Sequence, residues 1–266
     1  MNSAILPALT AAITAAKPDV VAISGDLTQR ARAAEFLAAR QFLDTLPKPQ
    51  IVVPGNHDVP LHDLISRWRS PLEKYRRYIN EDLEPFFADD EIAVLGINTA
   101  RSLTIKNGRI NAKQVAKSCS RMGERADGGT RILVTHHPFD VADHQETSDV
   151  VGRADMAMAE FARCRIDVIL TGHLHTSRIS SSGARYKIPG YSVLFIQAGT
   201  ATSVRHRDEL NAWNLIRIEK DRIAVDCLTW NEESGRFAVL RTEHYKRSLD
   251  GWSEVNPDSA AQKYAS

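Results

Sequence analysis

Four short apolar runs in this chain each end directly before a cluster of Asp, Asn or His residues. The runs cover residues 20–24, 51–54, 131–135 and 167–171, and β-branched residues dominate them. Such runs are typical of parallel strands buried on both faces. Because the carboxyl ends of parallel strands meet at one edge of a sheet, the residues that follow the four runs are predicted to share one site.

The residues at these strand ends are of the types that bind metal ions. They are Gly25-Asp26, Gly55-Asn56-His57-Asp58, His136-His137 and Gly172-His173-Leu174-His175. Carboxylate, amide and imidazole groups suit divalent first-row metals. A histidine taken alone is more often an ordinary core or surface residue, and one such strand end would be weak evidence. Four strand ends together predict a metal site.

The remaining periodicity predicts an α/β fold in one domain that spans residues 1–266. Helical spacing covers residues 3–16, 30–46, 61–80 with a break at Pro71, 112–122 and 151–164, and a further strand covers residues 92–98. Beyond Gly172, four apolar segments follow one another with short turns, at residues 191–196, 212–218, 223–228 and 237–240. These segments predict an antiparallel meander, and thus two packed sheets with helices outside.

Composition restricts the partners. The 266 residues carry a formal net charge of +1, so no overall field attracts nucleic acid or an anionic membrane, and neither partner is expected. No apolar stretch approaches the ~20 residues of a membrane span. The odd number of cysteines, Cys119, Cys164 and Cys227, predicts reduced thiols in a cytoplasmic protein. The first residues are expected to form a helix and not a signal peptide, since no Lys or Arg precedes the apolar ones.

The four clusters, in this order, resemble four of the five motifs of the calcineurin-like metallophosphoesterases. Pro54 before the second cluster and Val59-Pro60 after it are most similar to bacterial members that resemble cyclic nucleotide phosphodiesterases. Ala198-Gly199-Thr200 extends the resemblance over nearly the whole chain. The resemblance implies a four-layer αββα sandwich of two mixed β-sheets flanked by helices.

It also implies a hydrolase of phosphate esters with two divalent ions, among manganese, iron and zinc. The implied substrates are small phosphodiesters, such as a cyclic nucleotide or a small-alcohol diester, attacked by a metal-activated hydroxide. Asp26 would bridge the two metals. One metal would also take Asn56, His136 and His173, and the other would take His175.

Two further residues receive catalytic roles from the resemblance. His57 would bind the substrate and stabilise or protonate the leaving oxygen, and Asp58 would orient the ring of His57. His137 is left open between a contact with the ligands or the substrate and simple packing. The remaining histidines are expected to be ordinary residues, and the arginines near the loops are expected to be solvated: His62, His144, His206, His244, Arg101, Arg205 and Arg207.

The fifth family motif, an Asp-x-His at the end of the first strand, is absent. The first acidic residue is Asp19, and no His precedes it. The first strand is therefore expected to be missing, which leaves only Asp26 and His175 for the second metal. Two protein ligands rarely hold a catalytic cation, so one tight site and one weak or empty site are predicted. The natural chain is expected to begin upstream with the missing strand.

Two rival functions remain. A nuclease or nucleotide pyrophosphohydrolase is disfavoured because the chain has no basic stripe with interleaved aromatic residues. A catalytically impaired metal-binding module would lack the second site altogether. The presence of His57, Asp58, His173 and His175 disfavours this decay, because a decaying site would have lost other residues as well. The sequence does not indicate an oligomeric state.

Overall fold

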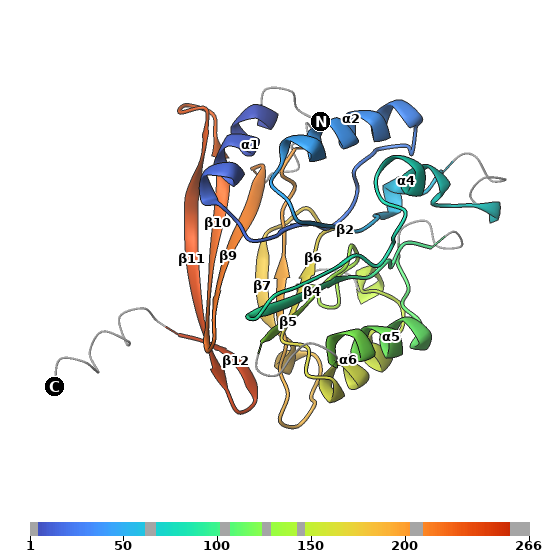
Figure 1. Cartoon of the computed structure of the whole chain (residues 1–266). Coiled ribbons are helices and arrows are strands. Elements are labelled where there is room, and N and C mark those ends of the chain that lie inside the picture. Colours follow the sequence, from blue (N-terminus) through green and yellow to red (C-terminus); the bar gives the residue numbers. More distant parts are fainter. Residues whose placement is uncertain are drawn as a thin grey trace.

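The largest sheet has six strands in the order β3-β4-β5-β6-β8-β7 (Figure 1). The computed structural model describes residues 5–61, 68–101, 107–123, 129–142, 147–202 and 210–255. The four central strands β4, β5, β6 and β8 are parallel, and β3 and β7 pair antiparallel at the two edges. The strands are β3 Phe86–Ala88, β4 Ile92–Gly96, β5 Thr130–Val134, β6 Val168–Thr171, β7 Arg178–Ser181 and β8 Leu194–Gln197.

Two smaller sheets form the layer next to it. β1 Val21–Ile23 and β2 Gln50–Val52 make a two-stranded parallel sheet. Four antiparallel strands in the order β12-β11-β10-β9 make the other sheet. They are β9 Ala212–Glu219, β10 Arg222–Asn231, β11 Arg236–Ser248 and β12 Gly251–Glu254. The two-stranded and four-stranded sheets are not joined by hydrogen-bonded strand pairs among the described residues.

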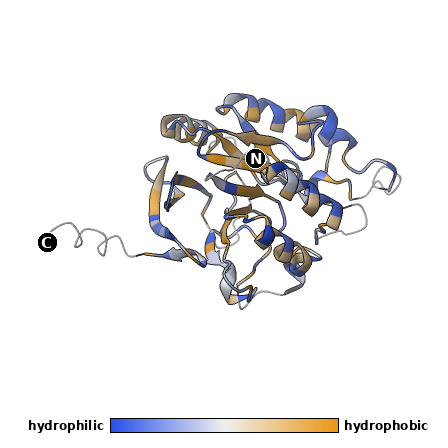
Figure 2. Ribbon diagram, turned by 60° about the horizontal axis from the view of Figure 1, so that its bottom comes forward, coloured by the Kyte–Doolittle hydropathy of each residue, from blue (hydrophilic) through white to orange (hydrophobic). Residues whose placement is uncertain are grey.

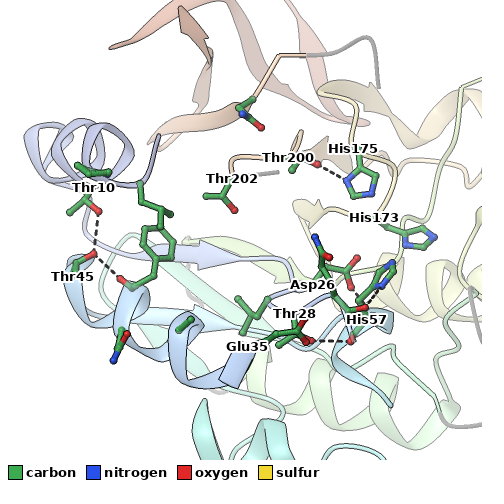
Figure 3. A pocket seen from close by; sticks show the side chains of 18 of the residues that line it. Thr10, Asp26, Thr28, Glu35, Thr45, His57, His173, His175, Thr200 and Thr202 are labelled. Carbon is green, nitrogen blue, oxygen red and sulfur yellow. Dashed lines mark hydrogen bonds between the residues drawn. The ribbon is translucent and has the colours of Figure 1, made fainter. Parts of the chain in front are cut away.

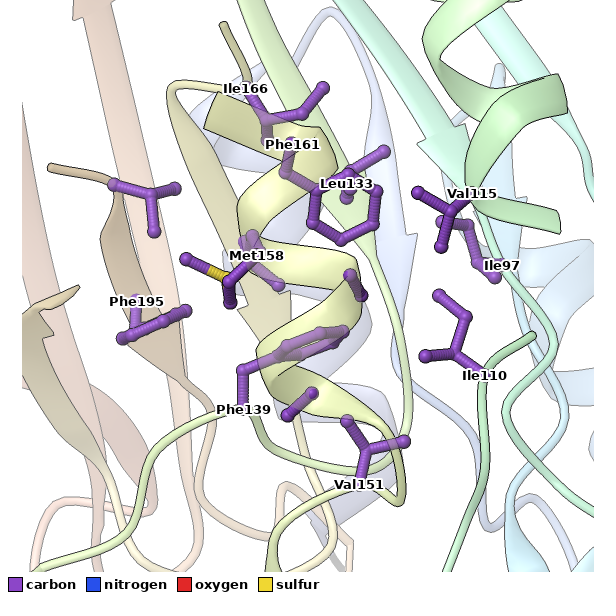
Figure 4. Close-up of a cluster of buried hydrophobic side chains, with 14 of the residues drawn as sticks. Ile97, Ile110, Val115, Leu133, Phe139, Val151, Met158, Phe161, Ile166 and Phe195 are labelled. Carbon is purple, nitrogen blue, oxygen red and sulfur yellow. The ribbon is translucent and has the colours of Figure 1, made fainter. Parts of the chain in front are cut away.

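Helices cover both outer faces. α5 Ala112–Gly123 and α6 Ala154–Arg163 cover one face of the six-stranded sheet. Figure 4 shows the apolar cluster between these helices and the sheet. Leu133 of the sheet, Val115 of α5 and Phe161 of α6 are fully buried in this cluster. α1 Ile5–Ala16, α2 Ala33–Thr45 and α4 Glu73–Tyr78 pack on β1 and β2 through a second cluster. Short 3-10 helices lie at Asn56–Asp58, Thr147–Asp149 and Ser182–Ala184.

A third apolar cluster lies between the sheets and completes a four-layer αββα sandwich. It joins Val134 and Val168 of the six-stranded sheet to Val225 and Tyr245 of the four-stranded sheet. The ribbon coloured by hydropathy shows the orange of apolar residues along the inner strands and blue on the outer helices (Figure 2). The predicted fold class is confirmed, but the second β-layer is divided into two sheets. No helix in the described part of the chain is long and apolar enough to cross a bilayer.

Several local predictions were wrong. Residues 191–196 were expected in the meander, but residues 194–197 form β8, which lies parallel to β6 in the six-stranded sheet. The meander instead ends with β12, whose four residues carry no clear apolar alternation. The helix expected over residues 61–80 is confirmed only as α4, since residues 62–67 lie outside the described part.

The expected thiols are corrected as well. Cys119 and Cys164 form a disulfide that joins α5 to the end of α6, while Cys227 is a buried free cysteine. The two half-cystines are 45 residues apart, and only the packing of the two helices brings them together. The cysteine count therefore no longer supports a cytoplasmic location.

Candidate active site

Four strand ends bring ligand-type atoms together around His136. Its Nε2 lies 3.0 Å from Asn56 Oδ1, 3.2 Å from His173 Nδ1 and 3.4 Å from Asp26 Oδ2. Its Nδ1 lies 2.6 Å from the carbonyl oxygen of Ser24. These residues, separated by up to 147 positions, meet because β1 and β2 of the two-stranded sheet and β5 and β6 of the six-stranded sheet end on the same side of the sandwich. Figure 3 shows Asp26 and His173 at this place. The structure brings together the predicted ligands Asp26, Asn56, His136 and His173.

Two glycines allow this close approach. Gly25 has a φ of +93°, and a Cβ there would lie 2.6 Å from the amide nitrogen of Gly55 and 2.9 Å from Nδ1 of His136. A Cβ on Gly55 would collide with the carboxylate of Asp26, with its Cγ only 2.8 Å away. The loops after β1 and β2 are therefore in backbone contact, which fixes Asp26 beside Asn56.

Backbone strain is concentrated at the same place. Asp26, His173 and His175 have left-handed φ values of 57°, 71° and 62°. Non-glycine residues seldom adopt this region, and such residues cluster where the surrounding structure needs a side chain in one direction. The left-handed backbone turns the side chains of these three residues toward the pocket that they line.

The site combines a charged carboxylate with a neutral imidazole. Burial acts to raise the pKa of Asp26, but the neighbouring His136 and His57 outweigh it and hold this pKa well below its usual range. Burial acts to lower the pKa of His136, but Asp26 raises it overall. Burial, together with the charge of His136, lowers the pKa of His173 to about 4. At neutral pH the His173 ring is therefore neutral, and one of its two nitrogens has a lone pair available.

One buried atom at this site has no partner within the described residues. It is Nε2 of His173, which reaches neither a hydrogen-bond partner nor solvent. A buried polar atom without a partner costs free energy, so such atoms mark sites where a ligand is bound. Among the described residues, His136, His137 and His173 form a cluster whose ligand atoms lie within 4.8 Å of one another. The imidazoles of His136 and His173, together with the oxygens of Asp26 and Asn56, are a donor set that fits a divalent metal ion.

His137 is part of the cluster and contacts the rings of two predicted ligands. It is fully buried, and its ring centroid lies 4.8 Å from those of both His136 and His173. Its Nδ1 lies 2.8 Å from the hydroxyl of Thr99, which fixes the ring. His137 therefore packs against the rings of two predicted ligands, His136 and His173.

The predicted pairing of Asp58 with the ring of His57 is wrong. Asp58 is buried, and its oxygens accept hydrogen bonds from the amides of Thr28 and Gly55, both at 2.9 Å, and from the hydroxyl of Thr28. The ring of His57 instead places Nδ1 3.1 Å from the carbonyl of Gln29. Burial and the charge of Asp26 raise the pKa of Asp58 to about 6. Asp58 thus joins the loop after β1 to the loop after β2.

His175 lies on the other side of the site, on the loop after β6. Its Nδ1 is 2.5 Å from the hydroxyl of Thr200, a residue that follows β8 (Figure 3). Thr200 was predicted only as part of a family pattern, without a role, and no role was predicted for Thr28. No sequence signal identifies Thr28, because its contact with Asp58 depends on the folded loops.

A cavity of about 1590 Å³ opens above these residues. Asp26, His57, His173 and His175 line its floor, and one side is formed by α1 and α2, where the hydroxyls of Thr10 and Thr45 are 3.1 Å apart (Figure 3). Other residues with predictions lie elsewhere. His244 is on β11, and Arg101 donates to the carbonyl of Arg109 at 3.0 Å. His62, His144, Arg205, His206 and Arg207 lie outside the described residues.

A histidine, carboxylate and amide cluster at strand ends, beneath a large pocket of an α/β sandwich, is the arrangement of a metal-dependent hydrolase. The chain belongs to the calcineurin-like phosphoesterase family, whose sequence model matches residues 2–177. The matched part contains the strand ends described above. The family assignment confirms the predicted resemblance.

Individual relatives agree with this family. A probable cyclic nucleotide phosphodiesterase of Synechococcus is 26% identical over 171 residues, which cover 62% of this chain and 61% of the relative. A glycerophosphodiester phosphodiesterase of Enterobacter lignolyticus is 45% identical over 42 residues, which cover 16% of this chain and 15% of the relative. The matches thus span less than two thirds of these relatives. A dimetal phosphatase of Danio rerio has the same fold, with a TM-score of 0.60 at 12% identity over 92% of this chain and 88% of that one.

Proposed function

We propose that this chain hydrolyses phosphodiesters of small molecules, such as a cyclic nucleotide or a diester of a small alcohol, with the help of divalent metal ions. The observation that carries the proposal is the convergence of Asp26, Asn56 and His173 on His136, with Nε2 of His173 buried and without a partner. The names of the two relatives support a diester over a monoester.

The residues that would hold the ions follow from this geometry. Asp26, Asn56, His136 and His173 would hold one ion, and Asp26 and His175 would contribute to a second. Bound divalent ions supply a Lewis acid for the phosphoryl oxygens and lower the pKa of water toward neutrality. Asn56 adds no charge, so the site stays attractive to an anionic diester.

His57 would act on the leaving oxygen in this proposal. Its amide donates to Asp26 Oδ1 at 3.0 Å, which holds the residue beside the site, and its side chain is exposed to the cavity. A carbonyl accepts but does not donate, so Nδ1–H must donate to Gln29. Nε2 is then the atom that carries or receives the exchanged proton. We assign His57 the general-acid role and Gln29 the task of fixing its tautomer.

Asp58 is a positioning residue in this proposal. Its carboxylate ties Gly55 to Thr28 and so keeps Asp26 and Asn56 at the spacing that a shared ion needs. His137 has the same kind of task for His136 and His173. Neither residue is proposed to touch the phosphate.

The test is hydrolysis of bis(p-nitrophenyl) phosphate, with p-nitrophenyl phosphate as the monoester comparison and manganese as the added ion. The wild-type chain should turn over the diester faster than the monoester. His173→Ala should lose at least ~100-fold of this rate, since changes around metal ligands already cost 10–100-fold. His244→Ala is the matched control and should behave as wild type. Equal rates in both variants would contradict the proposal.

A second candidate function is metal binding without turnover. It is favoured by the small ligand set of the second site, where His175 already contacts Thr200. In that case the chain would bind manganese through His173 and hydrolyse neither ester. The assay above, run beside a metal titration, separates the two candidates.

A further inference from the structure

Asn211 is a buried polar residue in the wall of the cavity above the predicted metal ligands. It lies directly before β9, and only 9% of its surface is exposed. Its backbone carbonyl accepts a hydrogen bond from the amide of Trp230 at 2.8 Å. Its side-chain amide has two hydrogens to donate and an oxygen that accepts, yet it forms no hydrogen bond with another described residue. Because buried amides are normally hydrogen-bonded, this one is available to a ligand in the cavity.

Asn211 is held beside the metal site from two sides. The next residue, Ala212, donates its amide to the carbonyl of Thr200 at 3.1 Å, while β10 holds the carbonyl of Asn211 through Trp230. The hydroxyl of Thr200 lies 2.5 Å from Nδ1 of His175. Asn211 is thus fixed near a predicted metal ligand without being one itself. Both line one cavity, so a group esterified to a phosphate at the metal site would extend into the space that Asn211 faces.

The wall of the cavity that α1 and α2 form is neutral. Ala11 of α1 and Phe42 of α2 line it. Thr10 and Thr45 belong to the same wall and lie across the cavity from His173 (Figure 3). The hydroxyl of Thr45 donates to the carbonyl of Phe42 at 2.7 Å, so the 3.1 Å contact between the two threonines uses the hydrogen of Thr10. Neither hydroxyl keeps a hydrogen for an anion, and this wall suits an uncharged neighbour with apolar faces.

The charges around the cavity disfavour a second anionic group. Its described lining residues include three acids, Asp26, Glu35 and Asp149, and no Lys or Arg. The carboxylate of Glu35 accepts from the amides of Arg30 and Arg32, each at 3.0 Å, and so stays at the start of α2. A further phosphate or carboxylate beyond the metal site would therefore meet acidic groups and no cation among the described residues.

We propose that Asn211 selects the alcohol part of the diester, and that this part is an uncharged group of about nucleoside size with apolar faces and an amide-like edge. The inference rests on the proposed function, because it places the phosphate at the predicted metal ligands. The side-chain amide of Asn211 donates to and accepts from the amide-like edge. The walls of α1 and α2 contact the apolar faces. An alcohol of one carbon reaches neither.

The kinetic test compares three diesters that share the p-nitrophenolate leaving group, with manganese as the added ion. They are methyl p-nitrophenyl phosphate, thymidine 5′-(p-nitrophenyl phosphate) and the 3′-phosphorylated form of the thymidine ester. The wild-type chain should hydrolyse the thymidine ester with a kcat/KM at least about 10-fold above that of the methyl ester. The added 3′-phosphate should lower kcat/KM by at least about 5-fold, because the described lining carries acids and no Lys or Arg.

Variants of Asn211 separate selection from a structural role. Asn211→Ala should lower kcat/KM for the thymidine ester by about 3–10-fold and keep that of the methyl ester within about 2-fold. Its melting temperature and manganese content should match wild type, since the lost amide has no partner among the described residues. Asn211→Asp removes both donor hydrogens and adds a charge, so it should lower kcat/KM for the thymidine ester further. Asn231→Ala, in the turn after β10, is the matched control and should keep the wild-type ratio of the two esters.

A second measurement does not depend on hydrolysis. Thymidine is titrated into the metal-free chain, and the side-chain amide resonance of Asn211 is followed by NMR after its identification by loss in Asn211→Ala. This resonance should shift, together with the methyl resonance of Ala11 on the opposite wall. The side-chain amide resonance of Asn231 should not shift.

Four results would overturn the inference. They are an unchanged ratio of the two esters in Asn211→Ala, an equal loss for both esters with a lower melting temperature, a 3′-phosphate that raises kcat/KM, and an Asn211 resonance that excess thymidine leaves in place. A shifted Asn211 resonance in a chain that hydrolyses no diester would contradict the proposed function and support the binding of the uncharged group. Hydrolysis with an unchanged ratio of the esters would do the reverse.

Discussion

Replacing Gly55 by Ala tests the close approach of the two loops that carry Asp26 and Asn56. The backbone φ of Gly55 is −99°, which any residue adopts, so the effect of this change is steric and not conformational. The new Cβ would lie 2.8 Å from Cγ of Asp26 and closer still to its carboxylate oxygen. The Cβ would also overlap the backbone nitrogen of Asp26. An ordinary contact begins at 3.4 Å, so both the side chain and the backbone of Asp26 must move by more than about 0.6 Å.

The structure sets the size of the expected effect. Overpacking of a well-packed site costs about 1–3 kcal/mol of unfolding free energy. For a chain of this length, each kcal/mol lowers the melting temperature by about 2–4 °C. Moving Asp26 away from His136 should also weaken manganese binding by at least ~10-fold, because ligand position determines affinity.

The assays are calorimetric titration with manganese and thermal melting in the presence of a chelator. Gly123→Ala is the matched control, because a Cβ at this position at the end of α5 meets nothing within 4 Å. It should bind manganese as wild type does and melt at the same or a slightly higher temperature. If Gly55→Ala binds manganese and melts like Gly123→Ala, the loop contact described here is wrong.

Three further predictions concern the site. His57→Gln should leave manganese affinity unchanged and lower kcat by about 10²–10⁴-fold. The loss of kcat should be larger for diesters whose leaving alcohol is less acidic. A uniform loss across a series of leaving groups would argue against the general-acid role. Asp58→Asn places an amide group against the donors of Gly55 and Thr28 and should cost about 1–3 kcal/mol in urea unfolding; wild-type stability would show that these bonds are unimportant. The pKa of His173 is about 4 in the folded chain and near 6.5 in the unfolded chain. As the pH falls from 6.5 to 4, the His173 ring therefore becomes protonated in the unfolded chain but stays neutral in the folded chain, which favours unfolding. The metal-free chain should therefore lose up to about 3 kcal/mol relative to His173→Gln between pH 6.5 and 4, and parallel pH profiles would contradict this.

The sequence predicted the part of the site that depends on strand ends. A β-branched run that stops at Gly25 or Gly55 identifies both the strand and the loop after it, and parallel strands share an edge. The convergence of Asp26 and Asn56 with His136 therefore needs no knowledge of the whole fold. The helices were predicted for a similar reason, because their apolar spacing is local.

The remaining features depend on contacts between distant segments. Residues 194–197 have the same apolar pattern whether they join the meander or the six-stranded sheet, so the pattern could not place β8. Cys119 and Cys164 meet only because α5 packs on α6. Asp58 was expected to orient His57, yet its buried carboxylate accepts hydrogen bonds from the amides of Thr28 and Gly55. These amides lie near Asp58 only in the folded loops.

The missing first strand was expected from the absent family motif, and it stays a prediction. Among the described residues, the second β-layer consists of two separate sheets, β1-β2 and β12-β11-β10-β9. The sequence could not predict this division of the second β-layer into two sheets. The division depends on how α1 and α2 pack on the apolar side chains of β1 and β2.

The most direct test of the account is the manganese content of the purified chain after manganese loading and removal of free metal, measured by elemental analysis. Wild type and His244→Ala should each retain about one ion per chain or more, and His173→Ala should retain almost none, because it removes the buried nitrogen that has no other partner. Equal manganese content in all three chains would contradict the assignment of the metal site.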